Sequence, residues 1–262
     1  MSIIERASRR VARGFGYELK RVLDPGAASV NMLAHARDLM ETTAPETRAF
    51  LSFCLTRLSL SKSQILQDLF ALYETGEKRS GYFVEFGATD GIVRSNSFML
   101  ETEFGWTGIV AEPARAWHEA LDRSRRCAVD HRCVTDRSGE AVTFTEVGEL
   151  ELSSIEQYSA NDDHALVRRG GRRYAVETVS LNDLLHQHGA PGDIDYLSVD
   201  TEGSELAILS ALDFDAWRPR VITVEHNFSP MRDRLFALLA GHGYVRKFTD
   251  LSQMDDWYVR AD

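Results

Sequence analysis

The stretch GYFVEFGATDGIVRSN, residues 81–96, decides the fold of this chain. Its apolar segment Tyr82–Phe86 runs directly into a glycine and a polar loop, as a buried strand does where it ends at a nucleotide pocket. The usual dinucleotide fingerprint GxGxxG requires a glycine at the position of Thr89. Two acids, Glu85 and Asp90, stand where a pyrophosphate would approach, and their charge would repel it. The loop therefore favours a positively charged ligand without phosphate.

A further acid follows at the end of the next apolar segment, Gly108–Ala111. Glu112 comes about 20 residues after the glycine loop, where an acid accepts hydrogen bonds from ribose hydroxyls. S-adenosylmethionine carries a sulfonium, an ammonium and a ribose, and it has no phosphate. The loop together with Glu112 thus predicts S-adenosylmethionine as the cofactor. For the loop by itself, a glycine turn with solvated acids is the alternative.

From residue 81 onward, short apolar strands alternate with helical segments of about 10 residues, which predicts an α/β fold with a mostly parallel sheet and helices on both faces. Residues 1–77 show apolar side chains at helical spacing and predict an N-terminal helical extension. The α/β domain then spans residues 78–262. Residues 146–176 lack regular patterning, and we expect either a lid or acceptor-binding insertion or a disordered surface excursion there.

Acids also end two later apolar segments. In DYLSVDTEG a buried strand ends at Asp200, and Glu202 follows it. In VITVEHN the next buried strand ends at Glu225, and His226 follows it. Because ligands of such sheets bind beyond the carboxyl ends of the strands, these groups are placed to deprotonate a substrate hydroxyl or to hold a divalent cation such as Mg²⁺. The alternatives are solvated acids and an ordinary polar histidine. Asp136, after the third strand-like region, is either a group near the adenine or an Asx-turn residue.

The overall composition excludes other classes of protein. A formal net charge of −10 over 262 residues argues against a general nucleic-acid-binding role. The three cysteines have no metal-ligand spacing and suit a reducing cytoplasm. No apolar run reaches about 18 residues, so no transmembrane helix is expected. Residues 1–22 are basic with apolar residues at helical spacing, and we expect either a solvated N-terminal helix or a peripheral contact with the inner membrane face or a partner.

The sequence resembles the FkbM family of S-adenosylmethionine-dependent methyltransferases from about Ser61 to Asp262. The resemblance rests on SQILQDLF, GYFVEFGATDGIVRSNSFMLE, GWTGIVAEP, VTDRSGE, VETVSLNDLL, DYLSVDTEGSELAIL and VITVEHN. It implies a Rossmann-like class I methyltransferase fold with a seven-stranded sheet. It also implies O-methylation of a hydroxyl, mainly on a sugar of a glycan or natural product.

Roles follow residue by residue from this resemblance. Positions matching the family's cofactor motifs, or lying beside them, give these candidates for S-adenosylmethionine binding: Glu85, Gly87, Thr89, Asp90, Asn96, Ser97, Glu112, Asp136 and Asp200. The catalytic candidates are Asp200, Glu225 and His226. The candidates for binding Mg²⁺ or another divalent cation are Asp200, Glu202 and Glu225.

Several alternatives stay open at this point. A methyltransferase-like binding protein without catalysis is one, and a methyltransferase for nitrogen or carboxylate acceptors, which needs no base, is another. An NAD-dependent sugar oxidoreductase is disfavoured by the missing GxGxxG motif. The protein is further expected to act on its acceptor in the cytoplasm, either as a single chain or as a homo-oligomer.

Overall fold

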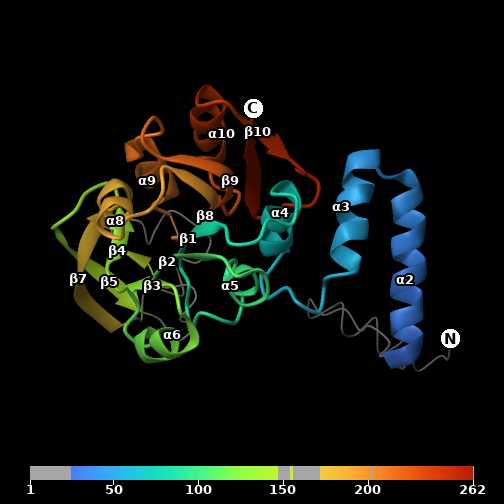
Figure 1. Ribbon diagram of the computed structural model, residues 1–262, viewed down its shortest axis with the longest axis horizontal. Helices are drawn as coiled ribbons and strands as arrows, with labels where there is room; N and C mark the ends of the chain where they lie inside the picture. Colours follow the sequence, from blue (N-terminus) through green and yellow to red (C-terminus); the bar gives the residue numbers. More distant parts are fainter. Residues whose placement is uncertain (1–24, 147–153, 156–171, 202, 262) are drawn as a thin grey trace, which may run out of the picture. The chain divides into compact units, whose positions relative to one another are not determined.

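The computed structural model describes residues 25–146, 154–155, 172–201 and 203–261 (Figure 1). The chain divides into two compact units, Met1–Ala49 and Phe50–Asp262. In the first unit the helix α2 spans Pro25–Thr42, and α3, Pro45–Leu55, begins before the boundary. Residues 1–22, for which we predict a membrane or partner contact, lie outside the described part. No helix in that part is long and apolar enough to cross a membrane.

Within the described residues, seven strands form one sheet in the order β10-β11-β9-β8-β1-β2-β3. The strands are β1 (Tyr82–Phe86), β2 (Thr107–Ala111), β3 (Ala128–Asp130), β8 (Asp193–Val199), β9 (Arg218–Glu225), β10 (Tyr244–Lys247) and β11 (Asp255–Arg260). Neighbours from β3 to β9 pair in parallel, whereas β11 is antiparallel to both β9 and β10. The predicted mostly parallel sheet is confirmed. The order along the chain reverses at β1, between β2 and β8, and a ligand crevice is expected at such a switch point.

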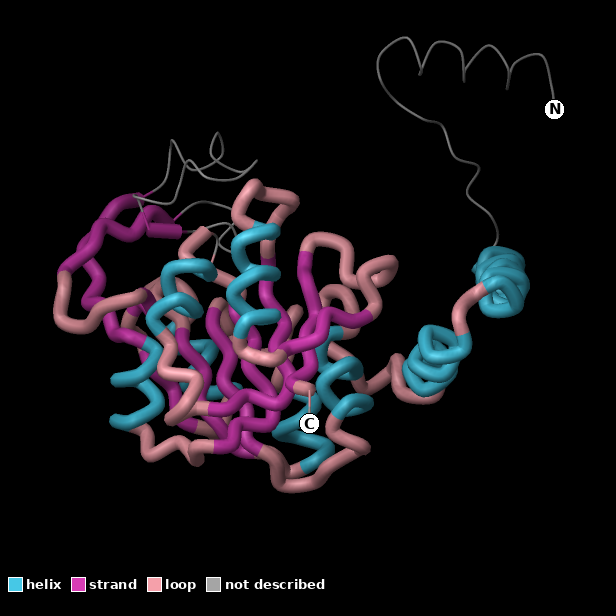
Figure 2. Tube along the Cα trace, turned by 90° about the horizontal axis from the view of Figure 1, so that it is seen from above, coloured by secondary structure: helices cyan, strands magenta, loops and turns pink. Residues whose placement is uncertain are grey.

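Helices cover both faces of this sheet (Figure 2). One face carries α4 (Gln67–Glu74), α5 (Phe98–Phe104) and α6 (His118–Ser124), and the other carries α8 (Leu181–Gln187), α9 (Glu205–Ala211) and α10 (Arg232–Gly241). Side chains alternate between the two faces along each strand, so Phe83 packs with the first set of helices while Val84 packs with the second. The continuous apolar runs seen in the sequence follow from this burial on both faces.

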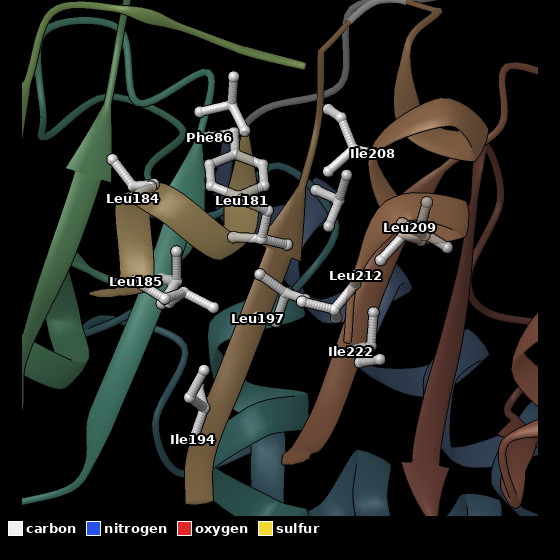
Figure 3. Close-up of a cluster of buried hydrophobic side chains, with 14 of the residues drawn as sticks. Phe86, Leu181, Leu184, Leu185, Ile194, Leu197, Ile208, Leu209, Leu212 and Ile222 are labelled. Atoms are coloured by element: carbon white, nitrogen blue, oxygen red, sulfur yellow. The ribbon is translucent and has the colours of Figure 1, made fainter. Parts of the chain in front are cut away.

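The core beneath α8 and α9 shows how helical spacing creates this packing (Figure 3). Leu181, Leu184 and Leu185 lie on one side of α8 because residues three and four apart share a helix face. They pack in the same cluster as Phe86 of β1 and Leu197 of β8, and all five side chains are buried. The strand ends that carry the candidate site are therefore held by a rigid layer.

The other face has an aromatic core. Phe50 of α3 and Phe70 of α4 lie with their ring centroids 5.9 and 4.8 Å from that of Trp257 in β11. The domain boundary that the sequence places at 77/78 stays a prediction, and the two compact units divide at residue 49/50. The reason is that the helices from residue 50 to 77 bury their apolar side chains against the sheet itself.

A second, smaller sheet in the described part has the order β4-β7-β5-β6. Its strands are β4 (Cys133–Thr135), β5 (Ala141–Glu146), β6 (Ser154–Ile155) and β7 (Arg172–Ser180). The sequence predicts one strand-like region over residues 126–134, but the Asp130 carboxylate accepts a hydrogen bond from the Arg132 backbone N–H at 2.9 Å and the chain turns between β3 and β4. Most of the predicted lid, residues 147–153 and 156–171, lies outside the described residues.

Candidate functional site

The first feature of the site is the close approach of the β1 and β8 strand ends. Gly87 follows β1 with a φ of +69°, and a Cβ atom there would lie 2.5 Å from the backbone oxygen of Asp200. Only glycine fits both this conformation and this separation. The glycine of the opening motif is therefore required by the neighbouring strand as well as by its own turn.

Glu85 lies buried below the loop that follows Gly87. Its carboxylate accepts hydrogen bonds from the Ser95 hydroxyl at 3.0 Å and from the Asn96 backbone N–H at 2.6 Å. The Ser97 hydroxyl donates to the same carboxylate. The Arg125 guanidinium lies 3.5 Å from Glu85 and donates to the Ser97 hydroxyl at 2.8 Å. Glu85 thus anchors the loop from within the core, and its predicted contact with the methionine end of the cofactor stays a prediction.

The tip of the loop is shaped by Asp90 and Thr89. One Asp90 carboxylate oxygen accepts hydrogen bonds from the backbone N–H groups of Ile92 and Val93, both at 2.8 Å, which is an Asx-type turn. The Thr89 backbone N–H donates to the Glu112 carboxylate at 2.9 Å. This bond ties the loop after β1 to the end of β2.

Glu112 itself is buried and accepts a second hydrogen bond from the Ala114 backbone N–H at 2.8 Å. Burial raises the pKa of its carboxyl to about 7. Next to the loop, the Asn96 side-chain amide donates to the Ser198 hydroxyl on β8 at 2.9 Å. The Asn96 side-chain oxygen is buried and has no hydrogen-bond partner within the described residues.

The acids that follow β8 and end β9 come together. The carboxyl groups of Asp200 and Glu225 are hydrogen-bonded to each other, and burial, followed by the charge of Glu205, raises the pKa of Asp200 to about 7. Burial and the charge of Glu205 outweigh the hydrogen bond with Glu225, which by itself lowers the pKa of Asp200. Glu202, the third predicted metal ligand, lies outside the described residues. Among the described ones, no three His, Cys, Asp or Glu side chains are grouped as metal ligands.

His226 faces away from this pair. Its Nδ1 accepts a hydrogen bond from the Phe228 backbone N–H at 2.9 Å, and its Nε2 lies 3.8 Å from an Asp256 carboxylate oxygen. Side chains alternate along β9 and β11, and Asp256 pairs in register with Val224 rather than with Glu225. His226 accordingly lies with Asp256 toward the α10 face. Its predicted catalytic role therefore lacks a direct contact with the acid pair.

Asp136 follows β4 in the small sheet, where its carboxylate lies 3.5 Å from the Arg137 guanidinium. The acid at the end of the third strand of the main sheet is Asp130. Its carboxylate accepts hydrogen bonds from Arg132 and from His188, and together these outweigh burial and hold its pKa near 2. Asp130 is absent from the candidates chosen by sequence because the predicted strand runs through β3 and β4 together. The signal that could have identified Asp130 in the sequence is its position directly after the apolar pair Ala128-Val129.

A comparison with protein families gives the identity of the chain. The family model of the methyltransferase FkbM domain matches residues 85–248, more than half of the sequence. The chain belongs to the FkbM methyltransferase family. It is accordingly an S-adenosylmethionine-dependent methyltransferase with a Rossmann-like fold.

Solved structures similar to this methyltransferase include two other methyltransferases. One is precorrin-6y C5,15-methyltransferase from Geobacter metallireducens GS-15, with 10% identity, a TM-score of 0.40, and coverage of 73% of this chain and 84% of that one. The other is a TehB-like SAM-dependent methyltransferase from Corynebacterium glutamicum ATCC 13032 Kitasato, with 9% identity, a TM-score of 0.38, and coverage of 83% and 98%. No curated protein matches the sequence.

The loop residues of the methyltransferase fit the cofactor that the family uses. Glu112 accepts one hydrogen bond from each of two backbone N–H groups, whereas a carboxylate offers about four acceptor positions. The remaining positions suit the two hydroxyls of a ribose. The unpartnered oxygen of Asn96 suits an ammonium donor, because a buried acceptor left unpaired costs about 1–3 kcal/mol. The individual contacts with S-adenosylmethionine remain predictions.

Replacing Gly87 with alanine is expected to weaken S-adenosylmethionine binding by at least about tenfold, because the left-handed backbone is strained for alanine by about 1–2 kcal/mol and the new methyl group collides with Asp200. Gly105→Ala is the matched control, since Gly105 has a φ of +68° and nothing within 4 Å of the position that a methyl group would take. Isothermal titration calorimetry with S-adenosylmethionine measures the affinity of both variants, and Gly105→Ala is expected to bind like wild type. Equal affinities in the two variants would contradict the close-approach argument.

Proposed function

We propose that this methyltransferase transfers the methyl group to a hydroxyl, most readily on a sugar of a glycan or natural product. The supporting observation is the Asp200–Glu225 pair beyond the carboxyl ends of β8 and β9, in which the pKa of Asp200 is raised to about 7. A base is most effective at neutral pH when its pKa lies near 7. A hydroxyl needs such a base, because it is a weak nucleophile until its proton is removed.

The protein itself has two tasks in this reaction, to remove a proton from the acceptor and to align the acceptor with the cofactor. S-adenosylmethionine, when bound, supplies a methyl group activated by a positively charged sulfur. Asp200 would accept the proton of the acceptor hydroxyl, and Glu225 would hold the Asp200 carboxyl in position through their shared hydrogen bond. The close approach of Gly87 to Asp200 puts this acid beside the cofactor loop. Alignment of the two reactants accounts for the rest of the rate enhancement.

The direct test is a transfer assay with the full-length protein and labelled S-adenosylmethionine. Panels of free sugars, nucleotide sugars and oligosaccharides are offered as hydroxyl acceptors, with amines and carboxylic acids offered in parallel. A methyl ether, identified by mass spectrometry and NMR, is the expected product. Methylation confined to nitrogen or carboxylate acceptors, which need no base, would reject the proposal. Repeating the assay with chelator and with added Mg²⁺ tests whether Asp200 and Glu225 also bind a divalent cation.

The three cysteines indicate in which cellular compartment the enzyme works. We infer a cytoplasmic enzyme from the reduced state expected for them, since all three are free in the structure. We also propose that the basic residues 1–22 make a peripheral contact with the inner membrane face or with a partner. A homo-oligomeric state is a separate proposal. Cell fractionation of the full chain, compared with a chain starting at Pro25, tests the membrane contact.

A further inference from the structure

We propose that Phe228 is an acceptor-binding residue, whose exposed phenyl ring stacks on the apolar face of a sugar ring while a hydroxyl of that sugar reaches the Asp200–Glu225 pair. The inference rests on the proposed function, because it names the sugar ring as the group that the acceptor site binds. Phe228 belongs to the turn of residues 226–231, which leads from β9 to α10. This turn lies beyond the carboxyl end of β9, where ligands of parallel sheets bind.

The first observation is the exposure of the ring. Among the large apolar residues that the structure describes, Phe228 has the largest exposed fraction, 70%. Burying a phenyl ring is favourable, so this side chain leaves free energy of burial unused in the folded protein. Single exposed apolar side chains are nevertheless common on protein surfaces. A role for the ring therefore needs a second observation, which the backbone beneath it supplies.

The backbone of the turn is strained at this ring. Asn227 and Phe228 have φ angles of +43° and +53°, both in the left-handed region. Asparagine tolerates this region, whereas a bulky phenylalanine is an outlier there and glycine would adopt it without steric cost. Strain of this kind clusters at ligand sites and persists where the surroundings fix the backbone. The turn thus carries a phenylalanine at a position that suits glycine, which points to a role for the ring itself.

Hydrogen bonds fix the turn. The Met254 carbonyl accepts bonds from the backbone N–H groups of His226 and Asn227, at 2.9 and 3.1 Å. The Phe228 backbone N–H donates to His226 Nδ1 at 2.9 Å, and the Ser229 backbone N–H donates to the His226 carbonyl at 2.8 Å. The buried His226 imidazole also supports the phenyl ring, with ring centroids 5.4 Å apart and planes at 73°. A ring held in this way loses little conformational entropy when a ligand binds to it.

The ring lies within the reach of one sugar from the acid pair. Phe228 follows Glu225 by three residues, so their Cα atoms are at most about 11 Å apart even in a fully extended chain. The bond from Ser229 to the His226 carbonyl folds the chain back, which makes the actual separation shorter. A sugar ring with its hydroxyl groups spans a comparable length. Since His226 faces the α10 side, Phe228 borders the acceptor site on that side of β9.

The chemistry of a phenyl ring beside acids suits a sugar. A pyranose carries C–H groups on its faces and hydroxyl groups around its rim. The negative face of a phenyl ring attracts the slightly positive C–H groups, and stacking removes both surfaces from water. The hydroxyls on the rim stay free to donate hydrogen bonds to carboxylates. A linear alcohol lacks such a face, whereas a cationic amine would also be attracted to the ring and is the competing acceptor.

Substitutions in the full-length protein test the ring. Phe228→Ala keeps a Cβ atom, and with it the backbone strain, but removes the stacking face. It is expected to raise the KM for a sugar acceptor by about tenfold with kcat nearly unchanged, because partial burial of a phenyl ring is worth about that factor in affinity. Phe228→Tyr keeps the face and is expected to bind like wild type. Phe236→Ala, which removes another exposed phenyl ring on α10, is the matched control and is expected to leave KM unchanged.

A glycine at this position separates the ring from the backbone. Phe228→Gly relieves the left-handed strain and is expected to have a higher midpoint of thermal unfolding than Phe228→Ala, while the two variants bind the acceptor equally weakly. A residue kept for the shape of the turn would instead give a glycine variant with normal acceptor binding. Circular dichroism and the affinity for S-adenosylhomocysteine confirm that each variant folds. Phe228→Leu, which keeps apolar bulk without the flat face, replaces any variant that does not.

A second readout needs no methyl transfer. Saturation-transfer NMR with methyl glycosides and the protein loaded with S-adenosylhomocysteine is expected to show saturation of the C–H protons on one sugar face, which is lost in Phe228→Ala. Unchanged KM and saturation in the folded variants would overturn the inference, as would a wild-type protein that saturates no methyl glycoside. Ring-dependent saturation in a protein that methylates no hydroxyl would uphold the inference and reject the proposed function. Transfer to amines alone, weakened in Phe228→Ala, would overturn the assignment of a sugar.

Discussion

Replacing Arg125 with methionine is expected to lower the free energy of unfolding by about 3–5 kcal/mol, the usual cost of breaking a buried ion pair by removing one partner. The Arg125 side chain is fully buried, 2.5 Å from the Glu101 carboxylate and 3.5 Å from that of Glu85. Methionine has nearly the same length but no charge, so both carboxylates would remain buried without their cation. Urea denaturation of the two proteins measures the difference.

The same substitution is expected to abolish cofactor binding at micromolar concentrations, because Arg125 and Glu85 together hold Ser97 and the loop that follows β1. Arg123→Met, two residues earlier, is the control. Arg123 is exposed and pairs with the exposed Glu119, so little change in stability or binding is expected there. An Arg125→Met protein of wild-type stability would show that the buried ion pairs are not what holds the loop.

Replacing Asp200 with asparagine is expected to reduce the rate of methyl transfer by about 10²- to 10⁴-fold, the range that a positioned general base contributes. In the wild-type enzyme, burial and the charge of Glu205 raise the pKa of Asp200 to about 7. The base is therefore protonated and inactive below that pH, and the rate rises as the pH increases through about 7. The variant is expected to lose both the rate and this pH dependence, as measured by initial rates between about pH 5 and 9.

Stability separates this result from unfolding. A carboxyl whose pKa is raised in the folded state binds its proton more tightly there, so the wild-type fold gains stability as the pH falls from about 7 toward about 4 and is destabilised by the charged form above that range. Asp200→Asn removes the charge and is expected to be at least as stable as wild type at about pH 8. Asp215→Asn, at an exposed position, is the control for activity. A rate within tenfold of wild type, with cofactor binding intact, would rule out Asp200 as the base.

Much of the fold can be predicted from local patterns. The strand Tyr82–Phe86 coincides with its predicted range, and most other predicted strands and helices of the α/β domain differ from the observed ones by a few residues at either end. At the end of the chain, the consecutive strands β10 and β11 pair antiparallel, as two strands joined by a short loop do. The small sheet is harder to predict. Its longest strand, Arg172–Ser180, begins in a glycine- and arginine-rich segment whose pattern gives no alternation of polar and apolar side chains.

The candidate site can be predicted in part. The sequence selects Asp200 and Glu225 because each lies where a buried apolar run stops, which is a local signal. Gln67 stands in SQILQDLF, one of the segments that carry the resemblance, but its hydrogen bond with Asp255 has no local signal because the two residues are 188 positions apart. For Glu85 the sequence indicates a ligand contact, but the observed partners of its carboxylate are the loop and Arg125, a residue 40 positions later.

The sequence by itself determined which elements form and which polar groups stand at the strand ends, because alternation, helical spacing and glycine turns act over a few neighbouring residues. Only the tertiary structure decided what those groups do. Register placed Glu225 opposite Asp255, burial raised the pKa of Asp200 to about 7, and strand alternation turned His226 toward Asp256. The first and third follow from strand pairing and pleat, and the second from desolvation and from charges in distant parts of the chain; all three exist only once the sheet and its covering helices have assembled.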